Sequence, residues 1–92
     1  MAEWRDGFGV LVENGDEIMS SSTSGGMVKL GTADQRPEDA AFMMRVHMAM
    51  RWGRQVPKPA SRSATGYNVV VLRKADGSVP EHFSDIVQKG GA

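Results

Sequence analysis

The chain has 92 residues, with 11 acidic and 11 basic side chains and no cysteine. This length is typical of one domain with a small core, and the absence of thiols excludes disulfides and thiolate metal sites. The polar start MAEWRDG argues against a signal peptide, and no apolar run approaches the ~20 residues that a membrane-spanning helix needs.

The charges are segregated along the chain. Residues 1–39 carry eight acids and three bases, residues 40–75 carry seven bases and no acid, and residues 76–92 carry three acids and one base. Two interpretations stay open. The basic middle either pairs with the acidic first segment inside the fold, or it forms a patch for an acidic protein or a nucleic acid.

The first third of the chain predicts short strands. Phe8, Val10 and Val12 alternate with other residues and predict a strand over about 8–13. Asn14-Gly15 is a strong hairpin signal, so a returning strand is expected over about 17–23. A serine-rich segment and Gly25-Gly26 then separate this strand from a third one over about 27–31.

Residues 37–52, PEDAAFMMRVHMAMRW, predict the main helix. Proline suits the first helical position, acids follow it, and Arg51 stands at the end, as the helix dipole favours. With a period of 3.6 residues, one face holds Phe42, Met43, Val46, Ala49 and Met50. A second stripe holds Ala41, Met44, Met48 and Trp52. This stripe either packs under another segment or is a contact surface.

Gly53 is expected to end this helix, and the remaining segments are shorter. Residues 54–66, RQVPKPASRSATG, predict a basic loop that is either a solvated linker or an arm for an anionic partner. A β-branched run predicts a strand over 67–74, and Asp76-Gly77 predicts a turn. Ser78 and Glu81 form a capping box that begins a short helix over 79–88.

The predicted fold class is therefore α+β, in one domain over residues 1–92. A small antiparallel sheet, made of a β-hairpin or three-strand meander, precedes the helix, and a further strand follows it. The sheet packs on the one main helix, and the short helix lies at the C-terminal end. The two histidines, His47 and His82, have no partner at metal-ligand spacing, and no acid–base couple or catalytic triad is recognisable. We expect no enzyme, no metal and no cofactor.

Three short motifs resemble a known family. They are Met48-Ala-Met-Arg-Trp52-Gly53, Tyr67-Asn-Val-Val-Val-Leu72 and Val79-Pro80-Glu81. In this order they resemble small type I-F anti-CRISPR proteins of Pseudomonas phages and mobile elements, over about residues 39–83. The basic loop 54–66 and the segment 20–26 depart from that pattern. The resemblance implies a non-catalytic phage inhibitor in the cytoplasm of the bacterial host. Such an inhibitor binds the RNA-guided CRISPR surveillance complex (a Cascade-type Cas subunit) and blocks target DNA binding or nuclease recruitment. With its basic middle, the chain is not expected to be a DNA mimic.

The predicted partner-binding residues combine the second stripe with nearby bases. They are Met44, Arg45, Met48, Arg51, Trp52, Arg54, Lys58 and Arg62. Two alternatives stay open. One is a small nucleic-acid-binding or antitoxin-like regulator that uses bases of the 45–74 region. The other is a homodimer that buries the methionine stripe.

Overall fold

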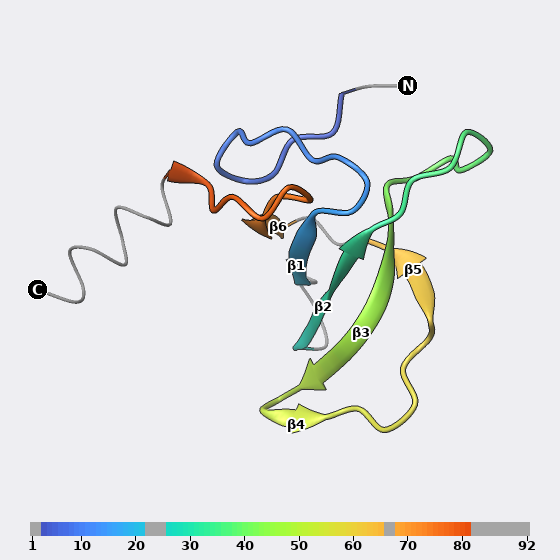
Figure 1. Cartoon of the computed structure of the whole chain (residues 1–92). Helices are drawn as coiled ribbons and strands as arrows, with labels where there is room; N and C mark the ends of the chain where they lie inside the picture. Colours follow the sequence, from blue (N-terminus) through green and yellow to red (C-terminus); the bar gives the residue numbers. More distant parts are fainter. Residues whose placement is uncertain (1–2, 22–25, 66–67, 82–92) are drawn as a thin grey trace, which may run out of the picture.

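The fold is one antiparallel β-sheet. A computed structural model describes residues 3–21, 26–65 and 68–81, and all statements below concern these residues. The strands are β1 (Glu17–Ser21), β2 (Met27–Ala33), β3 (Met43–Arg51), β4 (Arg54–Gln55), β5 (Arg62–Ala64) and β6 (Asn68–Arg73). The order across the sheet is β4-β3-β2-β1-β6, and β5 also pairs with β3, so β4 and β5 share one edge of β3 (Figure 1).

The predicted main helix over 37–52 is wrong, and with it the α+β fold class. Residues 43–51 form β3, the longest strand, which pairs along its length with β2 and at its two ends with β4 and β5. Pro37, assigned to the start of a helix, lies instead in a tight turn. There the Asp39 amide donates to the Arg36 carbonyl, and the Arg36 amide donates to the Asp39 carboxylate. Proline suits the second position of such a turn as well as the first position of a helix.

A β-bulge explains why β3 resembles a helix in sequence. Leu30 pairs with Met48 and Gly31 pairs with Val46, so His47 is an extra residue without a counterpart on β2. Met44 and Val46, before the extra residue, are two positions apart. Val46 and Ala49, on either side of it, also point inward but are three positions apart. A strand with this interruption no longer shows a strict two-residue period, and the 42, 46, 49 spacing then fits a helix equally well.

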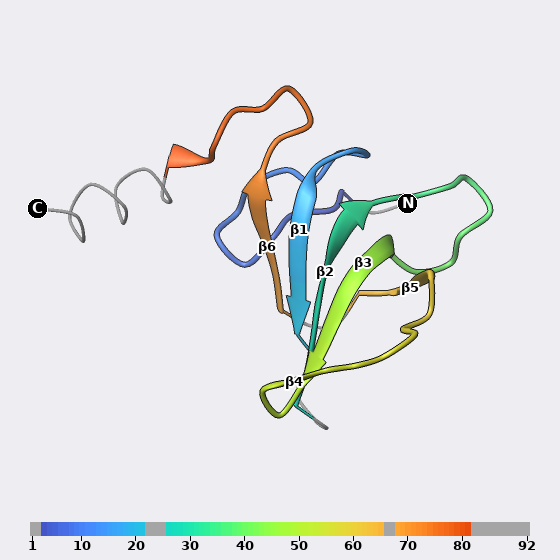
Figure 2. The ribbon, with the colours of Figure 1, turned by 60° about the horizontal axis from the view of Figure 1, so that its bottom comes forward.

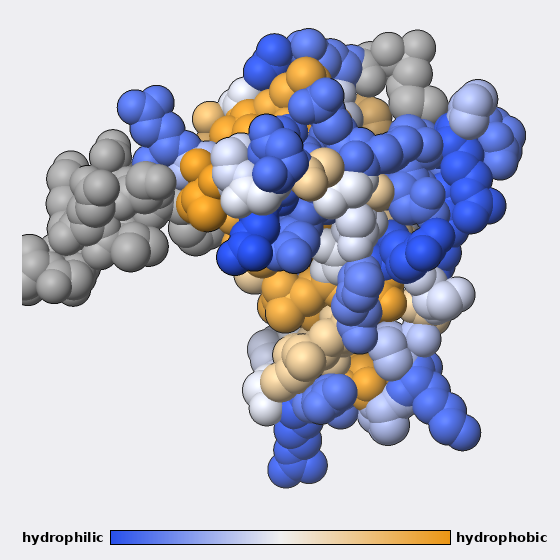
Figure 3. Space-filling model, viewed as in Figure 1, coloured by the Kyte–Doolittle hydropathy of each residue, from blue (hydrophilic) through white to orange (hydrophobic). Residues whose placement is uncertain are grey.

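The strands twist and curve across the sheet (Figure 2), and one face of the sheet holds the core. The buried apolar side chains of this core are Trp4, Val12, Ile18, Ala33, Met44, Val69 and Val71. Val10, Phe42 and Val46 pack against them while partly buried. The opposite face carries a row of paired residues, Val70, Met19, Leu30 and Met48, which no described segment of the chain buries completely. In Figure 3 apolar side chains gather over the middle of β1 and β2.

The N-terminal segment covers one end of the core, but not as a strand. The predicted strand over 8–13 is wrong: these residues form turns, with one isolated bridge between Arg5 and Leu11. Trp4 is buried and stacks on Phe42 with ring centroids 4.9 Å apart. The segment also closes the free edge of β6, where the Gly7 amide donates to the Val69 carbonyl.

Two buried aspartates hold this arrangement together. The Asp6 carboxylate accepts hydrogen bonds from the amides of Phe8, Val10 and Val71, each at 2.9 Å. Because Val71 lies in β6, Asp6 links the N-terminal turns to the far end of the chain. These bonds replace the water that a buried carboxylate would lose, so we assign Asp6 a structural role.

The second aspartate, Asp16, ends the predicted turn at Asn14-Gly15. Its carboxylate accepts from the amides of Glu13 and Ala75, and it forms an ion pair with Lys74. Burial by itself lowers the pKa of Lys74, but the carboxylates of Asp16 and Glu13 outweigh that effect and hold this pKa above its ordinary value. Asp16 therefore joins the Asn14-Gly15 turn to the residues that follow β6.

The other predicted elements have mixed outcomes. The strands expected over 17–23, 27–31 and 67–74 overlap β1, β2 and β6 as far as the structure describes them. The turn at Asp76-Gly77 is present, with the Gly77 amide donating to the Lys74 carbonyl. The expected loop 54–66 contains β4 and β5, which both pair with β3, while residues 56–61 between them form no strand. Most of the expected helix 79–88 lies outside the described residues.

Candidate binding site

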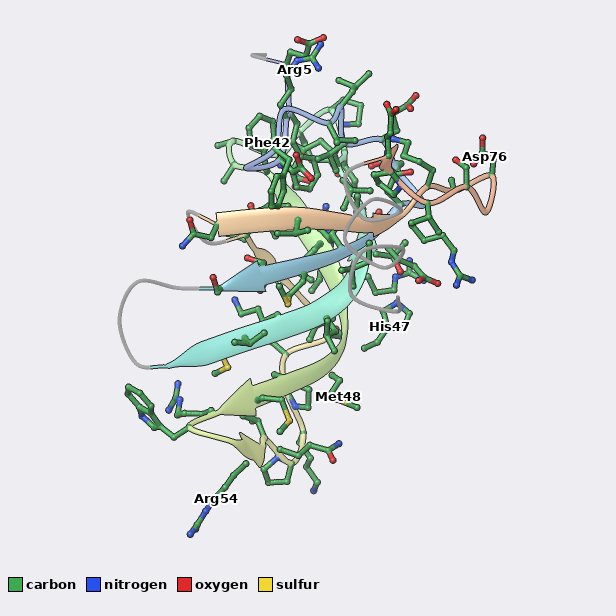
Figure 4. The ribbon with its side chains drawn as sticks, turned by 90° about the vertical axis from the view of Figure 1, so that its left-hand side faces the viewer. Arg5, Phe42, His47, Met48, Arg54 and Asp76 are labelled. Atoms are coloured by element: carbon green, nitrogen blue, oxygen red, sulfur yellow. The ribbon has the colours of Figure 1, made fainter. Side chains whose placement is uncertain are left out.

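The candidate site is the tip of the β3–β4 hairpin, which we define as Arg51, Trp52, Gly53 and Arg54. Arg51 and Arg54 pair as the last residues of the two strands, so Trp52 and Gly53 form a two-residue turn. Both turn residues have positive φ, 52° and 77°, as a type I′ turn requires. Gly53 adopts this conformation freely, whereas Trp52 is held in a region that bulky residues rarely occupy. The hairpin tip lies at the opposite end of the sheet from Arg5 and Phe42 (Figure 4).

The Trp52 indole rests on Gly26. A Cβ atom built on Gly26 would lie 2.6, 2.7 and 2.8 Å from three adjoining ring carbons, Cδ2, Cε2 and Cε3. Nearly equal distances to three adjoining atoms mean that the ring presents its face, not its edge, to Gly26. The residue is nevertheless 76% exposed, so the other face of the ring is open to solvent. The absence of a side chain at Gly26 thus allows the indole to pack flat against the main chain there.

Two arginines flank this ring. Arg51 and Arg54 stand directly opposite each other on adjacent strands, an arrangement in which like charges destabilise a sheet. Both are exposed, and among the described residues neither has an ion-pair or hydrogen-bond partner for its guanidinium. A negatively charged ligand that bound between them would relieve their repulsion.

A shallow hollow adjoins the hairpin tip. It is lined by Arg51, Trp52, Arg54, Gln55, Val56 and Pro57. Lys58 follows directly, exposed and with a positive φ of 85° between two prolines. The hairpin tip and this hollow therefore combine one open aromatic face with two exposed guanidinium groups, and Lys58 lines a neighbouring hollow that shares Val56 with this one. In Figure 3 hydrophilic side chains project at the end of the molecule where β4 lies.

The structure brings only part of the predicted site together. Arg51, Trp52 and Arg54 form the hairpin tip, and Lys58 lies four residues beyond it. Met44 is 0% exposed and belongs to the core, so it is not available to a partner. Met48, at 39% exposure, lies on the outer sheet face in the row with Leu30. In a regular strand Met44 and Met48, four positions apart, would share one face. The extra residue at His47 reverses the alternation, so Met44 faces the core and Met48 faces outward, and the expected stripe of Met44, Met48 and Trp52 is divided.

Arg45 and Arg62 lie opposite each other at the β3–β5 pair, away from the hairpin tip. The Arg62 guanidinium is engaged with the chain itself. It donates to the carboxylate of Asp34 at 2.9 Å, to the Asp34 carbonyl at 2.6 Å and to the carboxylate of Asp39. This guanidinium, with the Arg36 amide, holds the pKa of Asp39 below its ordinary value, and Asp39 and Asp34 in turn raise the pKa of Arg62. Arg62 therefore fastens the 34–42 loop to β5.

The ion pairs support the first interpretation of the segregated charges for only two bases of the middle segment. Arg62 and Lys74, from the basic middle, pair with Asp34, Asp39, Asp16 and Glu13 from the acidic first segment. For these two bases the segregation reflects pairing inside the fold. Five other bases of the middle segment have no ion-pair partner among the described residues: Arg45, Arg51, Arg54, Lys58 and Arg73. Three of the five lie at or beside the hairpin tip.

The sequence did not predict that Gly26 contacts the Trp52 ring, or that Val56 and Pro57 line the hollow beside it. The signal for the hairpin was present, since Trp52-Gly53 stands between two polar residues that can pair. Tryptophan is rare in the first position of such a turn, so the dipeptide was not recognised as one. Gly26 could not be linked to Trp52 without knowing that β2 and β3 pair.

Comparisons with protein-family models, curated proteins and solved structures find no match to this chain. Among the residues that the structure describes, no three His, Cys, Asp or Glu side chains converge as a metal site would need. The same residues include no helix long and apolar enough to cross a membrane. The fold and the site thus define a small antiparallel β protein with an exposed Arg-Trp-Gly-Arg hairpin tip.

Proposed function

We propose that this chain is a non-catalytic binding protein that attaches to an anionic surface of a larger assembly through its hairpin tip. The observation that carries the proposal is the open face of Trp52 between two unpaired arginines. Tryptophan and arginine are the residue types that most often dominate binding energy at protein interfaces. An exposed pair of opposed arginines favours a partner that brings negative charge.

The assembly that we propose as the partner is an RNA-guided CRISPR surveillance complex, in the cytoplasm of a bacterial host. The resemblance to type I-F anti-CRISPR proteins motivates this choice. Its motif Met48–Gly53 includes three of the four hairpin-tip residues, although here it is strand and turn and not the end of a helix. Bound at the hairpin tip, the chain would block target DNA binding or nuclease recruitment by occupying the surface, which requires no catalytic group.

The test is capture of a purified type I surveillance complex by the tagged full-length chain, with an interference assay in parallel. We expect the wild-type chain to capture the complex and to inhibit interference. Trp52→Glu should abolish both, because it replaces the ring by a charge that repels an anionic surface. Phe8→Glu is the matched control: Phe8 is 58% exposed in an N-terminal turn, three residues after Arg5, which lies at the opposite end of the sheet from the hairpin tip (Figure 4).

Two results would contradict the proposal. One is a folded wild-type chain that captures no surveillance complex and does not inhibit interference. The other is equal loss of capture in the Trp52→Glu and Phe8→Glu variants, which would place the contact elsewhere. Circular dichroism of each variant separates loss of binding from loss of fold.

A further inference from the structure

We infer that the open face of Trp52 is a stacking platform for an unpaired base, and that Arg51 and Arg54 hold the adjoining phosphates of a single nucleic-acid strand. The inference rests on the proposed function in that it assigns a class of ligand to the same hairpin tip. It does not depend on the identity of the larger assembly.

The position of the indole favours stacking over insertion into a pocket. One ring face lies on Gly26, and the main chain at Trp52 is fixed by the two-residue turn and by the donation of its amide to the Gly26 carbonyl at 3.4 Å. The ring is therefore oriented before any ligand binds, which lowers the entropy cost of binding. The free face of an aromatic ring held in this way accepts any base, because every base has a flat π surface.

The flanking charges fit the other half of a nucleotide. A guanidinium binds a phosphate through two parallel hydrogen bonds, and Arg51 and Arg54 are available for such bonds on both sides of the turn. Lys58, exposed, lines a neighbouring hollow that shares Val56 with the hollow at the hairpin tip and adds a further positive charge there. A strand whose base stacks on Trp52 would place its neighbouring phosphates toward these cations. Single-strand sites combine positive charge with aromatic platforms in this way.

The same geometry argues against two other anionic ligands. In a duplex both faces of each base are covered by its neighbours, so a lone ring at a hairpin end has nothing to stack on. An acidic protein surface would satisfy the arginines but would leave the open indole face without a matching flat group.

The experiment measures binding of fluorescently labelled 12-nucleotide oligouridine and oligothymidine by anisotropy, at about 50 mM and 200 mM salt. We expect the wild-type chain to bind both oligonucleotides, and an equimolar duplex of the same length more weakly. Trp52→Ala should lower the affinity by about 5- to 100-fold, and Trp52→Phe should retain most of it because a smaller ring still stacks. Arg51→Gln and Arg54→Gln should each reduce the slope of log affinity against log salt by about 0.7.

Two controls match these variants. Phe8→Ala removes an exposed aromatic side chain distant from the hairpin tip, and Arg73→Gln removes an exposed arginine of β6 that has no ion-pair partner among the described residues. Both should bind the oligonucleotides as the wild type does. Comparison of the ribose and deoxyribose strands shows which nucleic acid the hairpin tip prefers.

The outcomes separate this inference from the proposed function. No oligonucleotide binding by the folded wild type at 50 mM salt overturns the inference. If Trp52→Glu still abolishes capture of the surveillance complex in that case, the hairpin tip contacts protein and the proposed function stands. Binding that is unchanged in Trp52→Ala, or equal for duplex and single strand, also overturns the stacking platform. Oligonucleotide binding that depends on Trp52, without capture of the complex, supports the inference and contradicts the proposed partner.

Discussion

A Cβ atom on Gly31 would lie 1.8 Å from the carbonyl oxygen of Arg45, so β2 and β3 approach each other here at a distance that only glycine permits. The approach coincides with the bulge that leaves His47 unpaired. A methyl group at this position would collide with main chain, which cannot rotate away as a side chain can. The close contact and the bulge thus form one feature, and Gly31 is required for it.

We therefore predict that Gly31→Ala lowers the free energy of unfolding by several kcal/mol, because the β2–β3 pairing must shift. Urea denaturation followed by circular dichroism measures the change. Gly7→Ala is the control, since a Cβ atom there would meet only the Val69 carbonyl oxygen at 3.6 Å, an ordinary contact. Similar stabilities of the two variants would contradict the close approach at Gly31.

The contrast between Met44 and Met48 tests whether residues 43–51 form a strand. Met44 is 0% exposed in the core, so Met44→Ala should cost about 2–5 kcal/mol of stability. Met48 is partly exposed on the outer face, so Met48→Ala should cost less than about 1 kcal/mol. On the helix expected from sequence the two residues would share one stripe. Equal costs in thermal or urea unfolding would therefore favour the helix over β3.

The packing of the Trp52 ring on Gly26 predicts that Gly26→Ala lowers both stability and binding. The added methyl group would collide with the indole and would also occupy a positive φ of 61°, so we expect a stability loss of about 1 kcal/mol or more and weaker binding at the hairpin tip. Gly9→Ala is the matched control. Gly9 also has a positive φ, 86°, but a Cβ atom there would meet nothing within 4 Å.

Gly9→Ala should therefore lose only the stability that a non-glycine residue loses at a positive φ, and it should leave binding at the hairpin tip unchanged. Oligonucleotide anisotropy and urea denaturation of both variants supply the comparison. If Gly26→Ala binds and unfolds like Gly9→Ala, the ring does not depend on Gly26 for its position.

The Asp39–Arg62 ion pair predicts a loss of stability in acid. The pKa of Asp39 is lowered in the folded chain by Arg62, so the folded state favours the ionised carboxylate. Its contribution to stability is complete above the ordinary aspartate pKa and is lost as the pH falls through the lowered value. Asp39→Asn lacks this contribution at every pH.

Denaturation of both proteins between pH 7 and pH 2 checks this prediction. The wild type should be the more stable at pH 7, and the difference should shrink toward zero at the acid end. The pKa of Asp76 is also lowered, chiefly by its hydrogen bond from Ser78, but Asp76 is present in both proteins and cancels in the comparison. A difference that stays constant with pH would mean that Asp39 does not act through its charge.

Local signals predicted several elements of the sheet. The β-branched run before Arg73 and the turn residues Asn14-Gly15 and Asp76-Gly77 carry their information in adjacent positions. The helix over 37–52 was predicted because Pro37, the acids after it and Arg51 match the two ends of a helix, and because the bulge at His47 hides the two-residue period. Whether this segment pairs as a strand depends on β2 and β5, which the local sequence does not contain.

The candidate site was predicted in the same partial way. Trp52 was named as part of the second stripe of the expected helix, and Arg51 and Arg54 as bases near it. Because the three are close in sequence, they stay together in the hairpin although the helix is wrong. Met44 and Arg62 were assigned to the surface for reasons that only tertiary contacts could correct. One faces the core because of its strand position, and the other pairs with Asp34 and Asp39, residues more than twenty positions earlier.

The two tryptophans of the chain lie in opposite environments, one stacked on Phe42 in the core and the other open at the hairpin tip. Their fluorescence should therefore separate without any label. Emission from Trp4 should be blue-shifted and resistant to iodide quenching until the chain unfolds, whereas emission from Trp52 should be red-shifted and readily quenched. A ligand that covers the hairpin tip would protect only the second signal, so a single quenching titration distinguishes binding from unfolding in the native protein.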